Sequence, residues 1–210
     1  MGTVGLFFVG SVLLINGLTL LGVVRPKSAA GLNILIGMLL LGVTGQAILP
    51  VHSLSAPEDF ERVITATGFL LFGITYLYVA YSNLTGVPGC ALGWYCGWAS
   101  LVSAGLFALN LLRNGDVKSA MQWGLWTLLF AAFFALGALG ANRLTRATGW
   151  MTVAQSFVTC TVPGALMMLG LWNSLPNWVA LTATAGTAAL FLVLALVPPA
   201  SPVHAEPAHG

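Results

Sequence analysis

Three amide side chains, Asn16, Asn33 and Gln155, lie within otherwise apolar stretches of the sequence. An amide offers N–H donors and an acceptor oxygen, and burying it without partners costs roughly 2–7 kcal/mol. These groups therefore serve either as hydrogen bonds between helices or as hydrogen bonds to a small uncharged solute that is itself an amide. For most of the threonines in the same stretches, helix–helix hydrogen bonding is the better interpretation.

Aromatic residues in the stretch 119–139 repeat at helical spacing. Trp123, Trp126, Phe130 and Phe133 follow one another at steps of three and four residues, so they share one face of a helix. Flat amides stack on aromatic rings, which suits the same class of solute. The face either packs against other helices or lines a narrow passage, and this helix alone does not decide between them.

The elements that position these residues are membrane helices. The 210-residue chain is 58% hydrophobic and 6% charged, more apolar surface than a soluble domain can hide from water. A helix of about 20 apolar residues spans the ~30 Å hydrocarbon core. We expect an all-α membrane protein, one domain over residues 1–200 with a disordered tail at 201–210. Its bundle of seven transmembrane helices would cover residues 4–24, 29–49, 62–82, 94–112, 119–139, 150–171 and 178–197.

The charged residues exclude several functions. Every Asp, Glu, Lys and Arg falls in a link, at a helix end or in the tail, and the predicted helices hold no His. Ion-coupled transporters and pumps usually need an ionisable group at depth. Cys90, Cys96 and Cys160 form no CxxC pair, so we interpret them as packing thiols. We expect no enzyme activity, no metal or other cofactor and, with a net charge of +2 and no basic run, no nucleic-acid partner.

The distribution of Lys and Arg predicts the orientation. The links after the first, third and fifth helices carry Arg25, Lys27, Arg143 and Arg146 and no acidic residue. The opposite side carries three basic residues together with four acidic ones. Because cytoplasmic loops are enriched in Lys and Arg, the N-terminus is predicted outside and the C-terminus in the cytoplasm.

Several short patches, in the same order along residues 1–171, resemble the family of urea channels and amide transporters. The most specific match is Thr67-Gly68 followed by residues 71–78, Leu-Phe-Gly-Ile-Thr-Tyr-Leu-Tyr. The other patches are Val9-Gly10, Asn16-Gly17, Pro26-Lys27-Ser28 with Asn33 and Gly37, Trp94-Tyr95, and Trp150 with Gln155, Thr159 and Pro163.

The resemblance implies a passive channel in the bacterial inner membrane, with one pore inside each protomer of a hexamer. It implies that urea and short amides pass to a cytoplasmic amidase or urease. The pore residues that it implies are Leu6, Val9, Leu13, Phe72, Tyr76, Trp123, Trp126, Leu129 and Phe130. Asn16, Asn33 and Gln155 would offer hydrogen bonds along the route.

The chain departs from the acid-activated members of this family. Those members have Trp where this chain has Phe130 and Ser119, and Glu where it has Gln155, which implies a wider and neutral passage for a solute such as acetamide. They carry several His on the outside, whereas this chain has only His52 there, so we expect weak or no activation by acid. Residues 178–197 form an additional helix, either outside the bundle or between protomers.

Two rival hypotheses remain. The first is an amide transporter driven by the proton motive force, which the lack of ionisable groups at depth disfavours. The second is a membrane scaffold whose aromatic faces serve packing alone. Without the resemblance, the scaffold would rank level with the channel.

Overall fold

The computed structural model describes residues 2–197, and within this range the chain is helical with no strand. The main helices are α1 Gly2–Leu20, α2 Pro26–Ile48, α3 Pro57–Thr85, α4 Cys90–Ala108, α5 Val117–Gly137, α6 Thr145–Gln155, α7 Val162–Met168 and α8 Asn177–Leu196. The expected tail at 201–210 lies outside the described residues.

Short segments of other helix types extend two of these helices. A π-helical segment, η1 Leu109–Arg113, continues α4. A second, η3 Ser156–Thr161, joins α6 to α7, and the 3₁₀ segment η2 Asn142–Leu144 precedes α6. Counted as continuous helices, residues 2–197 contain 7 helices long and apolar enough to cross a membrane. This confirms the predicted bundle of seven transmembrane helices.

The contacts between helices close six of the spans into a ring. Each of α1 to α5 contacts the next helix along the chain, and α6 with η3 contacts α1. Helix α8 contacts α5 and α6 only from outside this ring, and buries just Thr187 and Phe191. The additional helix therefore lies outside the ring of its own chain, a position that both predicted alternatives share.

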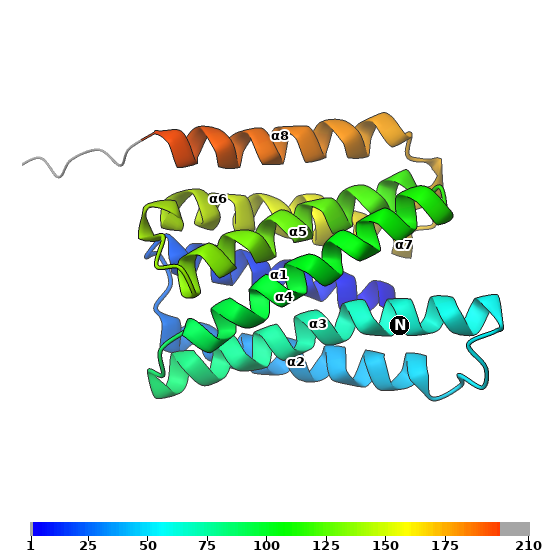
Figure 1. The fold of residues 1–210 in the computed structure, drawn as a ribbon, viewed down its shortest axis with the longest axis horizontal. Coiled ribbons are helices and arrows are strands. Elements are labelled where there is room, and N and C mark those ends of the chain that lie inside the picture. The colour runs from blue at the N-terminus through cyan, green and yellow to red at the C-terminus, as the bar shows by residue number, and fades with distance from the viewer. Residues whose placement is uncertain (1, 198–210) are drawn as a thin grey trace, which may run out of the picture.

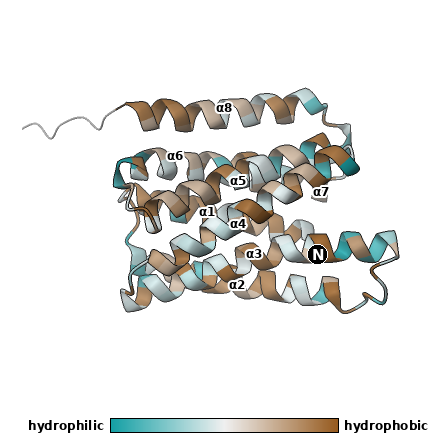
Figure 2. Ribbon diagram, in the orientation of Figure 1, coloured by the Kyte–Doolittle hydropathy of each residue, from teal (hydrophilic) through white to brown (hydrophobic). Residues whose placement is uncertain are grey.

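The spans alternate in direction, so the links gather at two opposite ends (Figure 1). The start of α1 and the links that follow α2, η1 and α7 share one end, which we call the N-terminal end. The links that follow α1, α3 and α5 share the other end with Val197. The strongly hydrophilic residues lie mainly near helix ends, including the first turns of α3, α6 and α8 (Figure 2). Apolar side chains cover the long middle parts, as a lipid surrounding requires.

Helix ends are where the sequence prediction was least accurate. Helix α1 ends at Leu20, four residues early, because Gly22 turns the chain at a φ of +77°. Helix α3 begins five residues early, at Pro57, with the acidic residues Glu58 and Asp59 in its first turn. The helix predicted to begin at residue 150 begins earlier, because residues 142–149 are already helical. Hydropathy marks the apolar part of a helix, whereas its backbone hydrogen bonds continue into the polar interface.

Two glycines bring α1 into backbone contact with α6 and η3. A Cβ atom at Gly17 would lie 2.9 Å from the Gly149 carbonyl oxygen and 2.9 Å from the Val153 nitrogen. A Cβ atom at Gly10 would lie 2.8 Å from the Ser156 carbonyl oxygen. The seven-residue spacing places both glycines on one face of α1. Small residues at such a crossing allow close helix packing in a membrane, where no hydrophobic force drives helices together.

A reciprocal amide pair ties α1 to α2. Asn16 donates from Nδ2 to Oδ1 of Asn33 at 2.9 Å, and Asn33 donates from Nδ2 to Oδ1 of Asn16 at 2.8 Å. Asn33 also donates to the Ala29 carbonyl oxygen at 2.9 Å, and it is fully buried. The pair therefore satisfies two amides that would otherwise be costly in an apolar setting.

We expect Gly17→Ala to lower the thermal stability of the detergent-solubilised protein. The added methyl group meets backbone atoms that cannot rotate away, and overpacking of this kind costs about 1–3 kcal/mol. Gly42→Ala is the matched control, because a Cβ atom at that position in α2 meets nothing within 4 Å. Equal melting temperatures for the two variants would contradict the close approach of α1 to α6.

A double-mutant cycle tests the amide pair. Asn16→Leu and Asn33→Leu should each lower stability by about 1–3 kcal/mol, because each leaves the other amide without its partner. The double variant should lose less than the sum of the two single losses, since it leaves no orphaned amide from the pair. Unfolding in denaturant provides the measurement, and strictly additive losses would show that the two side chains do not interact.

Candidate functional site: a constriction between two cavities

A cavity of about 660 Å³ opens at the N-terminal end of the ring. It lies mainly between α1, α3 and α5, and its polar lining includes Thr65, Asn110, Asn114, Ser119 and Gln122. Five of the sequence-predicted site residues line it: Leu6, Val9, Phe72, Trp123 and Trp126. We call this the outer cavity.

The outer cavity carries negative charge. Glu61 and Asp116 line it, and none of its described lining residues is basic. The basic residues at this end have other partners. Arg62 lies 3.9 Å from Asp59, the Arg113 guanidinium lies 4.3 Å from the centre of the Phe60 ring, and Lys118 donates to the carbonyl oxygens of Trp172 and Leu175.

A smaller cavity, of about 140 Å³, lies toward the opposite end of the ring, and we call it the inner cavity. Its described lining contains no Asp, Glu, Lys, Arg or His, and its polar residues are Asn16, Thr19, Thr75, Asn83, Tyr76 and Cys96. Six of the sequence-predicted site residues line it: Leu13, Asn16, Phe72, Tyr76, Leu129 and Phe130. A solute in this cavity therefore meets only uncharged side chains.

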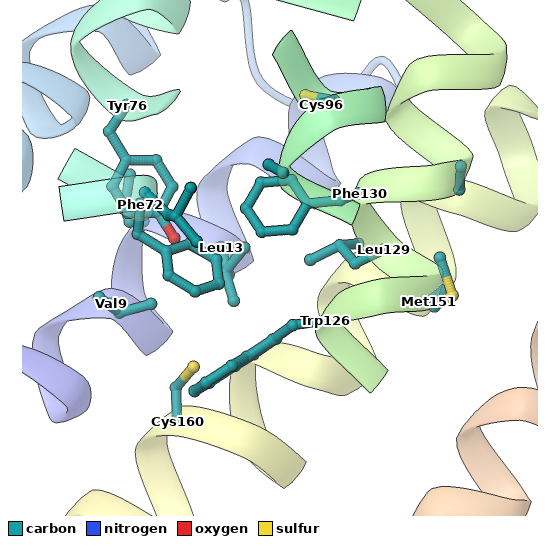
Figure 3. Close-up of a cluster of buried hydrophobic side chains, with 14 of the residues drawn as sticks. Val9, Leu13, Phe72, Tyr76, Cys96, Trp126, Leu129, Phe130, Met151 and Cys160 are labelled. Carbon is teal, nitrogen blue, oxygen red and sulfur yellow. The ribbon is translucent and has the colours of Figure 1, made fainter. Parts of the chain in front are cut away.

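Aromatic rings separate the two cavities. Phe72 lines both, and its ring centre lies 5.0 Å from that of Trp126 and 5.2 Å from that of Phe130. Tyr76 stacks on Phe72 at 6.0 Å. Figure 3 shows these rings, from α3 and α5, gathered with Val9 and Leu13 of α1. We call Val9, Leu13, Phe72, Trp126 and Phe130 the constriction; all five are buried.

Hydrogen bonds hold Trp126 in the constriction from behind. Its indole Nε1–H donates to the Thr159 hydroxyl at 3.0 Å, and that hydroxyl donates to the Gln155 carbonyl oxygen at 2.7 Å. Gln122 donates from Nε2 to the Thr159 carbonyl oxygen at 2.8 Å. Trp126 thus faces the lumen with its ring and the α6–η3 segment with its only polar atom.

A glycine makes room for the neighbouring tryptophan. The ring of Trp123 meets that of Trp126 edge-on, with centres 4.7 Å apart. A Cβ atom at Gly68 would lie 2.8 Å from Cη2 of Trp123, so a larger residue at this position would displace the Trp123 ring. Gly68 belongs to the Thr67-Gly68 patch that the sequence singled out.

Two of the twelve predicted site residues line neither cavity. Asn33 is fully buried and bonds to Asn16 and to its own helix. Gln155 is also fully buried and donates from Nε2 to the Leu125 carbonyl oxygen at 3.0 Å. Two buried polar atoms nearby, Oε1 of Gln155 and the hydroxyl of Tyr76, have no hydrogen-bond partner among the described residues. Of these two residues, only Tyr76 lines the inner cavity.

Sequence reasoning missed the part played by Thr159, Gln122 and Gly68. Gln122 carried a usable signal, because it precedes Trp126 by four residues and so lies on the same helix face. Thr159 appeared in the sequence only as part of the patch with Trp150, and its reach to Trp126 depends on the π-helical segment η3, which no residue pattern marks. Thr159 and Gly68 each contact a tryptophan that the sequence did identify, whereas Gln122 bonds Thr159.

The two cavities approach each other from opposite ends of the ring, with the buried constriction between them. Among residues 2–197, no three His, Cys, Asp or Glu side chains lie close enough together to hold a metal ion. An ion that entered the inner cavity would lose hydration without receiving a charged partner in exchange. The site therefore suits small uncharged molecules.

The chain is similar to known membrane transport proteins. The model of the AmiS/UreI family transporters matches residues 1–171. The chain is 37% identical over 195 residues to the putative transporter protein AmiS2 of Rhodococcus erythropolis, covering 92% of this chain and 89% of that protein. It is 28% identical over 190 residues to the acid-activated urea channel of Helicobacter pylori, covering 80% of this chain and 97% of that one.

Its fold agrees with these similarities. The closed-state cryo-EM structure of the H. pylori urea channel superposes with a TM-score of 0.70 at 26% identity, covering 82% of this chain and 100% of the channel. Helix α8 begins after the part of the chain that the family model matches. The chain is a multi-pass membrane transport protein, not an enzyme, and belongs to the AmiS/UreI family of transporters.

Proposed function

We propose that this protein is a passive channel through which urea and short aliphatic amides cross the membrane. The observation that carries the proposal is the neutral inner cavity, which the rings of the constriction separate from the outer cavity. A neutral wall neither binds a proton for coupling nor replaces the hydration shell of an ion. It does accommodate an uncharged molecule that moves down its own gradient.

The shape and polarity of the constriction suit an amide. The rings of Phe72 and Phe130 contact each other, with centres 5.2 Å apart and planes inclined by 35°. We propose that they move apart to let a planar molecule stack between them. The unpaired hydroxyl of Tyr76 lies next to them and can donate to a carbonyl oxygen. The Asn16 side chain lies further along the inner cavity. We propose that Asn33 and Gln155, which line neither cavity, act by holding the helices that do.

The preferred solute is larger or less polar than urea. Phe130 fills less of the constriction than the tryptophan implied for acid-activated relatives, and Ser119 leaves the outer cavity open at its position. Gln155 is neutral where those relatives carry a carboxylate. We therefore propose acetamide or another short amide as the main solute. With His52 exposed and alone on its loop, we propose that acid has little effect on flux.

The setting of the channel follows from the charges and from the family. Four basic residues lie at the end of the ring opposite the N-terminal end: Arg25, Lys27, Arg143 and Arg146. We place this basic end in the cytoplasm. The outer cavity would then face outward across a bacterial inner membrane. We further propose residues 1–200 as one channel domain, a hexamer with a lumen in every protomer, and a cytoplasmic amidase or urease that consumes the solute.

Stopped-flow flux into proteoliposomes tests the proposal. Acetamide and urea should equilibrate faster than in protein-free liposomes, butyramide should be slower than acetamide, and a protonophore should change none of these rates. Rates at neutral and acid pH should agree closely. Collapse of uptake with the protonophore would favour the proton-driven transporter. Equal rates for urea and butyramide would refute the size preference. A steep rise in flux at acid pH that is lost in His52→Ala would refute the expected pH behaviour.

Trp126→Ala should raise butyramide flux relative to acetamide flux, because removal of the indole widens the constriction most for the larger solute. Trp178→Ala is the matched control, since Trp178 is 65% exposed on α8 and lines neither cavity. The measurement is the flux ratio at equal protein incorporation. An unchanged ratio in Trp126→Ala would mean that this tryptophan serves packing only.

A further inference from the structure

The hydrogen bond between Trp126 and Thr159 has a fixed direction. An indole N–H can only donate, so the Thr159 oxygen must accept at 3.0 Å. The single hydroxyl hydrogen of Thr159 then points at the Gln155 carbonyl oxygen, 2.7 Å away. Both groups are fully or almost fully buried, so water does not compete for either bond. The indole therefore has one bonded orientation.

Thr159 is itself held firmly. It lies in the π-helical segment η3, and its backbone carbonyl accepts the bond from Gln122, four residues before Trp126 on α5. Helix α1 closes the other side of this segment, where a Cβ atom at Gly10 would lie 2.8 Å from the Ser156 carbonyl oxygen. Thr159 thus accepts two hydrogen bonds from side chains of α5: its backbone carbonyl accepts from Gln122, and its hydroxyl accepts from Trp126.

The position of the indole decides how wide the constriction is. The Trp126 ring lies edge-on to Phe72 and to Trp123, with centres 5.0 Å and 4.7 Å away. The bond to Thr159 attaches the polar edge of the indole to the α6–η3 segment, on the wall of the lumen. Without this bond, the side chain can adopt other rotamers, and an indole ring turned into the constriction would narrow the passage.

We propose that Thr159 is a positioning residue that holds Trp126 against the wall of the lumen and thereby sets the largest amide that passes. The inference rests on the proposed channel function. It assigns the size limit to a hydroxyl that lies behind the constriction and touches no solute. Thr159 lines neither the outer nor the inner cavity.

Three variants separate this role from packing. Thr159→Val removes the hydroxyl at constant shape, and Thr159→Ser restores it. Thr152→Val is the matched control, because Thr152 is equally buried on α6 and bonds only the Thr148 carbonyl oxygen of its own helix. In proteoliposomes, loss of one such bond should lower the butyramide-to-acetamide flux ratio about fivefold in Thr159→Val. Thr159→Ser and Thr152→Val should keep the wild-type ratio.

A second readout does not depend on flux. In protein labelled with ¹⁵N at tryptophan, the indole resonance that disappears in Trp126→Phe identifies Trp126. This resonance should move upfield in Thr159→Val, and stay in place in the other two variants. If wild-type protein passes no amide, the channel proposal fails while the resonance still tests the bond. If amides pass but the flux ratio in Thr159→Val is unchanged or higher, Thr159 does not set the size limit.

Discussion

The close approach of α1 to the α6–η3 segment is the constraint on which the rest of the structure depends. Gly10 and Gly17 let the first span lie directly on backbone atoms of the sixth, and this contact closes the ring of helices. An open row of six helices would have no lumen. The same contact fixes Val9, next to Gly10, in the constriction. Packing of small residues at one seam thus determines the geometry of a site built from large ones.

Alternate helices of the ring line the cavities, and the helices between them supply hydrogen bonds. Most of the lining of both cavities comes from α1, α3 and α5. Each of these is bonded by a polar side chain of a neighbour: Asn33 of α2 bonds Asn16, Tyr95 of α4 donates to the Leu71 carbonyl oxygen, and Gln155 of α6 donates to that of Leu125. Polar side chains of α2, α4 and α6 therefore hold α1, α3 and α5 in place, which leaves apolar and aromatic side chains to line the cavities.

The sequence predicted the spans, and it marked the aromatic face of α5 that lies at the two cavities, because both leave regular patterns. Hydropathy identifies a membrane-spanning segment, and the spacing of Trp123, Trp126 and Phe130 identifies one face of a helix. Neither pattern depends on which helices pack against it. Several helix ends were displaced by four residues or more; at Pro57 and Gly22 the reason is backbone geometry, which hydropathy does not report. The partners of Trp126 were out of reach for another reason. A π-helical turn shifts the register of Thr159 without leaving any trace in composition or period.

The carboxylates at the outer mouth have a consequence for what the protein keeps out. A carboxamide and the acid formed by its hydrolysis have almost the same shape, so a sieve of rings alone separates them poorly. Glu61 and Asp116 present fixed negative charge there, with Arg62, Arg113 and Lys118 occupied elsewhere. A like charge about 4 Å away costs an anion about 1 kcal/mol even in water. For the proposed amide channel, this charge would disfavour entry of the carboxylate relative to the amide of the same shape.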